Sequence, residues 1–341
     1  MSEAPRRSSR RYLWLLSLPA ALALGLGTTS ASASPLTPPA PQDSLAAVAQ
    51  VGPTIVDIDA KLGYQSAIGA GTGIVIGPST ILTNNHVVAG ATDLTARSIG
   101  NGQTFPATVI GYDRQHDIAV LQLAGGGLQP ANIGNSDTIA VGDPVVALGN
   151  AGGVGGTPSA VDGRIAALNQ TVSASDSLTG STETLNGLIQ VDAGIRPGDS
   201  GGPTVNAANQ VIGMTTAASE NYHLGHGQGF AIPINEAMAI AGQIQRGGSP
   251  TIHIGPTAFL GVGVNDAAGG AGAIVRQVIP AGPAAGAGVV PGDVITSLNG
   301  QPVNSATALT SILDQHHPGD NVQVGLGGRT VSVTLADGPP G

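Results

Sequence analysis

The stretch Gly198-Asp199-Ser200-Gly201-Gly202-Pro203 places one serine inside a run of glycines. Glycine permits backbone conformations that a side chain would resist, so main-chain N–H groups beside this serine can face a reacting carbonyl. Upstream, the chain carries Asn85-His86-Val87-Val88 and then His116-Asp117-Ile118-Ala119. A histidine, an aspartate and a serine therefore follow one another in an order that indicates a serine hydrolase.

The chemistry assigns a role to each of these residues. A serine hydroxyl is a poor nucleophile at neutral pH and needs an imidazole within hydrogen-bond reach to accept its proton. We predict that Ser200 is the nucleophile, that His86 is the general base and that Asp117 orients the imidazole. The backbone N–H groups of Gly198 and Ser200 would form the oxyanion hole. The other histidines are interpreted as solvated, non-catalytic residues: His116, His223, His226, His253, His316 and His317.

The composition favours a mainly β fold. The 341-residue chain holds 53 glycines and 24 prolines but only 2% aromatic residues, which is typical of many turns and short aliphatic strands. Short β-branched runs recur between residues 54 and 214, and nothing between them is long and helical enough for a βαβ crossover. Antiparallel barrels are therefore favoured over a parallel sheet.

The N-terminus has the pattern of an export signal. Four arginines precede an apolar run from Tyr12 to Leu26, and Ala31-Ser32-Ala33 offers a small-residue cleavage site. We predict a signal peptide over residues 1–33 and a proline-rich leader over 34–43. The alternative, a retained membrane anchor, is less favoured because about 15 apolar residues fall short of the roughly 20 needed to span a bilayer. The mature chain would be secreted or held in the cell envelope, without a stable membrane span.

Two domains are expected after the leader. Residues 44–246 form the hydrolase unit, which opens with a short helix capped by Ser44 and carrying Leu45 on its apolar side. Residues 247–256 are interpreted as a linker between the two domains. Residues 257–337 form a small α+β unit, in which five strand-like runs, the first over 259–264, are interrupted by a helix near 305–314.

Several partner classes are excluded by composition. The formal net charge is −9 and Lys61 is the only lysine, so the chain lacks the basic footprint of a nucleic-acid-binding protein. There is no cysteine, and no group of metal-ligating residue types has ligand spacing. We therefore predict no metal and no cofactor.

Blocks along most of residues 45–335 resemble the HtrA/DegP family of trypsin-fold serine proteases, and within it the exported mycobacterial members. The blocks surround the three candidate catalytic residues and occur in family order. They are Gly71-Thr72-Gly73-Ile74-Val75-Ile76, Ile81-Leu82-Thr83-Asn84-Asn85-His86-Val87-Val88, Asp117-Ile118-Ala119-Val120-Leu121, Ala147-Leu148-Gly149-Asn150, residues 191–202 and Gly229-Phe230-Ala231-Ile232-Pro233.

The resemblance implies a trypsin-like double six-stranded β-barrel with the triad between the barrels, followed by one small α+β PDZ domain. It implies an exported endopeptidase that cleaves unfolded or damaged envelope proteins and assembles as a homotrimer. Extended substrate would pair with the strand of Thr215, Thr216 and Ala217, with Thr216 close to Asp117. Gly194 and Ile195 would line an uncharged S1 pocket suited to small or branched aliphatic side chains.

In the PDZ unit, Phe259, Leu260, Gly261 and Val262 resemble the loop that grips the terminal carboxylate of a peptide. A docked C-terminal peptide would add a strand at the sheet edge beside the 305–314 helix.

The chain also departs from the family pattern. Position 199 is Asp where many bacterial members carry Asn, the segment Lys61 to Ser66 is too short for a long regulatory loop, and the N-terminal aromatic residues of family trimers are not evident. The second departure argues against large cage-like assemblies, and the third removes the usual contacts of the family's trimer. A second hypothesis of another class also stays open: a non-enzymatic peptide-binding or chaperone-like module whose triad rests in an inactive geometry. Loops over 152–156 and 171–187 would be the segments that misalign the oxyanion hole.

Overall fold

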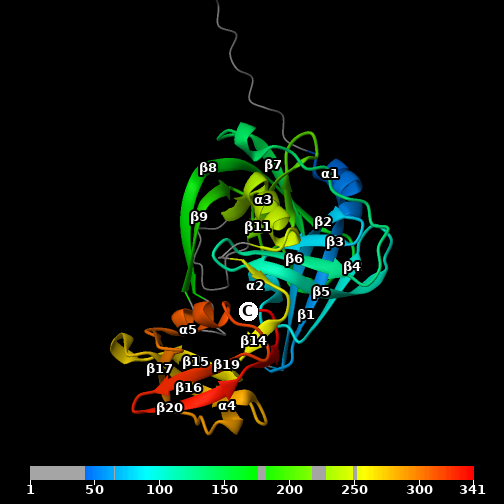
Figure 1. Ribbon diagram of the computed structural model, residues 1–341. Helices are drawn as coiled ribbons and strands as arrows, with labels where there is room; N and C mark the ends of the chain where they lie inside the picture. Colours follow the sequence, from blue (N-terminus) through cyan, green and yellow to red (C-terminus); the bar gives the residue numbers. More distant parts are fainter. Residues whose placement is uncertain (1–42, 65, 176–181, 217–227, 249–251) are drawn as a thin grey trace, which may run out of the picture. The chain divides into compact units, whose positions relative to one another are not determined.

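A computed structural model describes residues 43–64, 66–175, 182–216, 228–248 and 252–341 (Figure 1). The expected signal peptide and the leader up to Gln42 lie outside the described residues, and so does Ala217. Across the described ranges, no helix combines the length and the apolar character needed to cross a bilayer.

The first six strands close into a barrel. Their order is β5-β4-β1-β2-β3-β6, and β5 also pairs with β6, while β13 (His253–Ile254) adds to the outside of β5. Inward-facing side chains such as Val56, Ile58 and Val75 are fully buried in the barrel. The strands are β1 (Ile55–Leu62), β2 (Ala67–Gly77), β3 (Thr80–Thr83), β4 (Asp93–Ser98), β5 (Thr104–Asp113) and β6 (Ile118–Leu123).

The next six strands close a second barrel in the order β10-β11-β12-β9-β8-β7. The prediction of two six-stranded antiparallel barrels is thus confirmed (Figure 1). The strands are β7 (Pro144–Gly149), β8 (Ser159–Ser175), β9 (Thr182–Val191), β10 (Pro203–Val205), β11 (Val211–Thr216) and β12 (Gly229–Pro233).

One apolar cluster joins the two barrels. Ile74 and Leu82 from the first barrel, Leu148 and Met214 from the second, and Ile234 of a helix all belong to it. Burying an aliphatic side chain of this size contributes about 1.5–3 kcal/mol to stability, so this shared core holds the two barrels together. The helical segments of the barrel unit are α1 (Ser44–Val51), η1 (Gly52–Thr54), α2 (Asn85–Val88), η2 (Ser136–Thr138), η3 (Ala151–Gly153) and α3 (Ile234–Gln245).

The expected cap of the first helix was wrong by one residue. Asp43, rather than Ser44, caps α1, and its carboxylate accepts hydrogen bonds from the N–H groups of Leu45 and Ala46. The buried face carries Ala47 and Val51, whereas Leu45 is exposed. Adjacent Asp and Ser are both good caps, so the sequence alone does not distinguish them.

The C-terminal unit has its own core, drawn from residues 258–335. A path of strands runs β15-β16-β17-β19-β20, β18 pairs with β17, and β14 pairs with β21. The expected strand over 259–264 is split at Leu260 and Gly261, because Gly261 has φ +80°. The elements are β14 (Thr257–Phe259), β15 (Val262–Asp266), η4 (Ala268–Gly270), β16 (Ala273–Val278), α4 (Pro283–Gly286), β17 (Val294–Leu298), β18 (Gln301–Pro302), α5 (Ala306–Leu313), β19 (Asn321–Leu326), β20 (Arg329–Thr334) and β21 (Ala336–Gly338).

Candidate active site

His86 and Asp117 are in direct contact. His86 lies on the short helix α2 that follows β3, and its Nδ1 is 2.8 Å from Oδ2 and 3.0 Å from Oδ1 of Asp117. The backbone N–H of His86 also donates to Asp117 Oδ1, at 2.9 Å. The imidazole is 40% exposed and the carboxylate 2% exposed. A buried carboxylate that accepts from Nδ1–H leaves Nε2 as the proton acceptor.

Asp117 is presented by a tight turn between β5 and β6. Its φ is +55°, a left-handed conformation uncommon outside glycine. Asp113 holds the turn: it accepts a hydrogen bond from the backbone N–H of His116 at 3.1 Å and lies 2.8 Å from His116 Nδ1. From the second barrel, the hydroxyl of Thr216 donates to Asp117 Oδ2, at 3.2 Å.

Ser200 is buried in the turn before β10, and that turn is bonded to the first barrel. The N–H of Thr72 donates to the Ser200 carbonyl at 2.8 Å, and the Thr72 hydroxyl donates to the Gly198 carbonyl at 2.7 Å. The hydroxyl of Thr83 donates to the Thr72 carbonyl, also at 2.7 Å. Since Thr83 lies three residues before His86, these bonds link the serine turn to the segment that carries the imidazole.

Position 198 accepts only glycine. Gly198 has φ +96°, and a Cβ placed there would lie 2.1 Å from the carbonyl oxygen of Asn150. The turn is closed by N–H donation from Asp199 to the Arg196 carbonyl and from Gly202 to the Asp199 carbonyl, each at 3.0 Å. The backbone conformation around the serine is therefore set by sterics and main-chain bonds.

The glycine-rich loop 151–156 is tied to this turn. Gly152 N–H donates to the Pro197 carbonyl at 2.7 Å, and Gly155 N–H donates to Asn150 Oδ1 at 2.8 Å. Asp57 on β1 is buried beside the loop, and burial raises the pKa of its carboxyl to about 6, against the lowering effects of the Gly156 backbone hydrogen bond and the Arg97 charge.

The residues expected to contact substrate fall into three groups. Gly194 is exposed, and Ile195 is half-buried beside Gly229, where an added Cβ would lie 2.2 Å from Ile195 Cδ1. Thr215 is buried on β11, and its N–H donates to the Gly202 carbonyl at 2.7 Å. Ala217 lies outside the described residues.

The loop of Phe259, Leu260, Gly261 and Val262 lies at the start of β15, the terminal strand of its sheet. Helix α5 packs against β15. The Leu260 side chain is buried, and the Phe259 ring stacks on Tyr64 with 5.1 Å between centroids.

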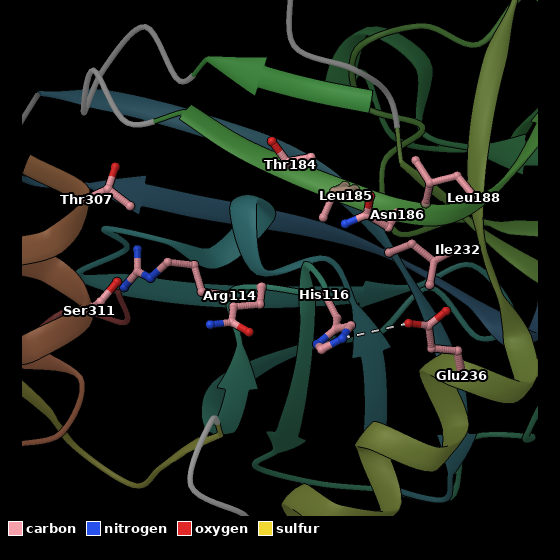
Figure 2. Close-up of a pocket in the computed structure, with 11 residues that line it drawn as sticks. Arg114, His116, Thr184, Leu185, Asn186, Leu188, Ile232, Glu236, Thr307 and Ser311 are labelled. Atoms are coloured by element: carbon pink, nitrogen blue, oxygen red, sulfur yellow. Dashed lines mark ion pairs between the residues drawn. The ribbon is translucent and has the colours of Figure 1, made fainter. Parts of the chain in front are cut away.

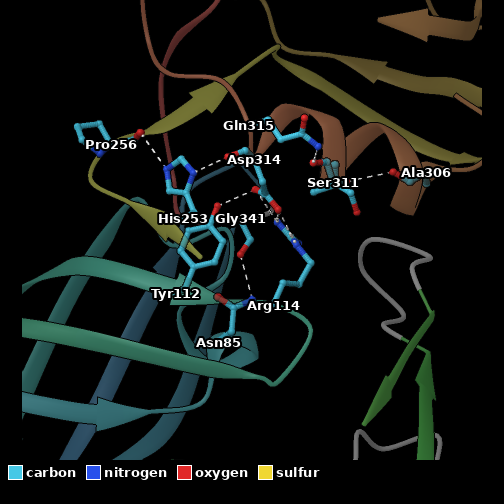
Figure 3. Close-up of polar contacts among 11 residues, drawn as sticks. Asn85, Tyr112, Arg114, His253, Pro256, Ala306, Ser311, Asp314, Gln315 and Gly341 are labelled. Atoms are coloured by element: carbon cyan, nitrogen blue, oxygen red, sulfur yellow. Dashed lines mark hydrogen bonds and ion pairs between the residues drawn. The ribbon is translucent and has the colours of Figure 1, made fainter. Parts of the chain in front are cut away.

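Asp314, at the end of α5, joins the C-terminal unit to the turn that carries Asp117 (Figure 3). Its carboxylate accepts from the Tyr112 hydroxyl at 2.7 Å and from Arg114 Nε at 3.1 Å. Burial raises the pKa of the Tyr112 hydroxyl. The expectation that His253 is solvated was wrong: it is 4% exposed, stacks on Tyr112, and its Nδ1 lies 2.9 Å from the Asp314 carbonyl.

A cavity of about 370 Å³ opens beside the same turn (Figure 2). It is lined by Arg114 and His116, by Leu185 of β9, and by Ser311 of α5 among others. His116 Nε2 is 4.0 Å from Glu236 Oε1, and burial raises the pKa of Glu236.

The sequence prediction did not include Thr72, Thr83 or Gly229 as site residues. All three lie inside the family blocks, so their place in the pattern was the only available signal. Their contacts depend on how two barrels meet, which local sequence does not encode.

Comparison with known proteins identifies two family domains. Residues 71–214 match the trypsin-like peptidase domain, and residues 258–335 match the PDZ domain. The solved structure of the HtrA-type protease AlgWS227A with tripeptide superposes with a TM-score of 0.53 at 28% identity, covering 88% of this chain and 98% of that one.

Curated relatives include the serine protease PepD of Mycobacterium tuberculosis, 38% identical over 91% of this chain and 70% of its own length. The periplasmic pH-dependent serine endoprotease DegQ of Escherichia coli is 37% identical over 76% of this chain. The chain spans only 56% of DegQ and 52% of a DegP-like endoprotease of Pseudomonas savastanoi. With both domains matched in order and 70% of PepD covered, the chain belongs to the HtrA/DegP family of trypsin-like serine proteases that carry a PDZ domain.

Proposed function

We propose that Ser200, His86 and Asp117 form the catalytic triad of a serine endopeptidase. The observation that carries this proposal is the buried Asp117 carboxylate 2.8 Å from His86 Nδ1, with the Ser200 turn bonded to the same barrel through Thr72. Ser200 Oγ attacks the scissile carbonyl while His86 Nε2 takes its proton, and the N–H groups of Gly198 and Ser200 bind the oxyanion. His86 then protonates the leaving amine, and water releases the acyl group by the same steps.

The S1 pocket is proposed to take small or branched aliphatic side chains. Support comes from Ile195, whose side chain occupies the space over Gly229. Peptides with Val or Ala at P1 should be cleaved faster than those with Lys or Asp. Ile195→Ala should shift the preference toward Leu or Met, because it removes most of the side chain from that space. A P1 library cleaved by wild type and by this variant gives the readout.

The substrates are proposed to be unfolded or damaged proteins of the cell envelope. Substrate in extended form would pair with the strand of Thr215, Thr216 and Ala217, and the loop of Phe259 to Val262 would bind C-terminal carboxylates beside β15. Residues 1–33 would be removed on export, leaving a protease domain over 44–246, a linker over 247–256 and a PDZ domain over 257–337. A homotrimer is the assembly that the family resemblance supports, and sedimentation of the mature chain tests it.

The direct test of the triad is hydrolysis of an unfolded protein by the mature chain and by Ser200→Ala. Losing a triad serine costs on the order of a millionfold in kcat. If the Ser200→Ala variant kept a tenth of the wild-type rate of hydrolysis, Ser200 would not be the nucleophile. The hydrogen bond from the Gly152 N–H to the Pro197 carbonyl ties loop 151–156 to the Arg196–Ser200 turn, and it supports this active geometry over a resting, non-enzymatic one.

A further inference from the structure

Asp199, immediately before Ser200, has an unusual set of partners. The carboxylate is 3% exposed, Oδ1 lies 2.7 Å from the hydroxyl oxygen of Ser159, and Oδ2 accepts the backbone N–H of Arg196 at 2.9 Å. Within the ranges that the structure describes, no salt bridge reaches it within 4.0 Å. A buried carboxylate is thus held by two hydrogen bonds, one of them from a side chain 40 positions earlier in the chain.

Ser159 has two acceptors for one proton. At the start of β8, its hydroxyl oxygen is 2.7 Å from Asp199 Oδ1 and 3.0 Å from the carbonyl oxygen of Gly149, at the end of β7. A hydroxyl donates a single hydrogen, and neither an ionised carboxylate nor a carbonyl supplies another. The shorter, charge-assisted bond to Asp199 is the stronger of the two. If the side chain at position 199 donated a hydrogen bond to the Ser159 oxygen, the Ser159 hydroxyl could donate its own hydrogen to the Gly149 carbonyl.

The turn around Asp199 is closely packed against β7. A Cβ at Gly149 would lie 2.6 Å from both Cα and Oδ1 of Asp199, and a Cβ at Gly202 would lie 2.1 Å from the Leu148 carbonyl oxygen. The Asp199 side chain therefore has little room to move independently of its backbone. Displacing it displaces the N–H groups of Gly198 and Ser200 on either side.

We propose that Ser159 is a positioning residue for proteolysis: by its hydrogen bond to Asp199 it fixes the Arg196–Ser200 turn in the form that presents the oxyanion hole. This inference rests on the proposed catalytic role of Ser200. Oxyanion donors act mainly in the transition state, so loosening them lowers kcat and leaves KM nearly unchanged.

The test compares the steady-state kinetics of five variants with those of wild type. Ser159→Ala should lower kcat by about 10- to 100-fold with KM within about threefold, since loss of a whole oxyanion donor costs about 100- to 1000-fold. Asp199→Asn should lower kcat less than Ser159→Ala does, because its amide donates to Ser159 and its carbonyl oxygen still accepts from Arg196. Ser159→Ala/Asp199→Asn should recover at least about threefold over Ser159→Ala, because no buried charge is left short of a donor.

Ser136→Ala is the matched control. Ser136 is also buried, but its hydroxyl oxygen accepts the N–H of Asn235 at the start of α3, away from the serine turn. This variant should lose thermal stability without losing kcat. Ser159→Cys, which keeps the size of the side chain with a weaker donor, should give a kcat between those of Ser159→Ala and wild type, and it serves if Ser159→Ala does not fold.

The proposal is overturned if folded Ser159→Ala or Ser159→Cys keeps wild-type kcat, or if the Asp199→Asn change fails to improve the Ser159→Ala enzyme. An inactive Ser200→Ala together with a fully active Ser159→Ala would overturn this inference alone. An active Ser200→Ala would instead overturn the proposed nucleophile.

Discussion

The hydroxyl of Thr216 donates a hydrogen bond to the carboxylate of Asp117, with 3.2 Å between Oγ1 and Oδ2. Thr216 ends β11 in the second barrel, and Asp117 precedes β6 in the first. The bond therefore spans the two barrels and helps to hold the carboxylate that orients His86. The family resemblance predicts this proximity, and the contribution of the bond to catalysis can be measured.

Thr216→Val should lower kcat about tenfold, since a hydrogen bond to a charged group contributes about 1.5–3 kcal/mol and Asp117 keeps its other donors. The measurement is kcat on a peptide substrate. Thr54→Val is the matched control, because Thr54 is a buried threonine whose hydroxyl donates to the Val51 carbonyl. Equal kcat values for the two variants would contradict a catalytic role for the Thr216 hydroxyl.

Gly198→Ala should abolish hydrolysis. The new Cβ would lie 2.1 Å from the Asn150 carbonyl oxygen, which forces the Arg196–Ser200 turn to move. Gly152→Ala is the comparison: Gly152 also has positive φ, at +75°, but nothing lies within 4 Å of its added Cβ. That variant should pay only the backbone strain, about 1–2 kcal/mol of stability, and keep most of its kcat. The idea fails if both variants lose activity equally.

Asp57 should make stability depend on pH in the acid range. Its carboxyl has a folded-state pKa of about 6 against an ordinary value of 3.8, so the folded chain holds this proton more tightly than the unfolded chain does. Stability is thus greatest with both states protonated, falls as pH rises from about 4 to 6, and is flat above. The difference in free energy of unfolding between wild type and Asp57→Asn should change by about 3 kcal/mol across that window, measured by urea unfolding. A difference that stays constant from pH 4 to 7 would contradict the buried state of this carboxyl.

Arg114 and Asp314 should couple energetically. The pair is only 17% and 20% exposed, and Arg114 Nε lies 3.1 Å from Asp314 Oδ2. In a double-mutant cycle of Arg114→Ala and Asp314→Ala, the thermal unfolding data should give a coupling energy of about 1–2 kcal/mol. Strictly additive effects would show that the contact contributes nothing to stability.

Sequence predicted the features that depend on local pattern. The glycines around Ser200, the β-branched runs of the barrels and the helical spacing before Leu313 each encode their structure in neighbouring residues. The resemblance to the family additionally predicted the order of the two domains and the substrate-pairing role of the strand that carries Thr216. These are signals that short windows of sequence carry without knowledge of the fold.

Features that depend on distant contacts were missed. His253 is buried because Tyr112 and Asp314, both far away in sequence, enclose it. The partner of Asp199 is Ser159, which looks like an ordinary polar residue at a strand start until β7, β8 and the serine turn come together. Barrel closure and strand register create these contacts, and neither follows from local propensity.

Labelling with a fluorophosphonate tests the central claim most directly, because the reagent reacts only with a serine activated by its base and oxyanion hole. We expect one label per chain, located by peptide mapping on Ser200, and none on Ser200→Ala. Label retained by Ser200→Ala, or no label on a folded wild-type chain with or without C-terminal peptides, would contradict the assignment of Ser200, His86 and Asp117 as a working triad.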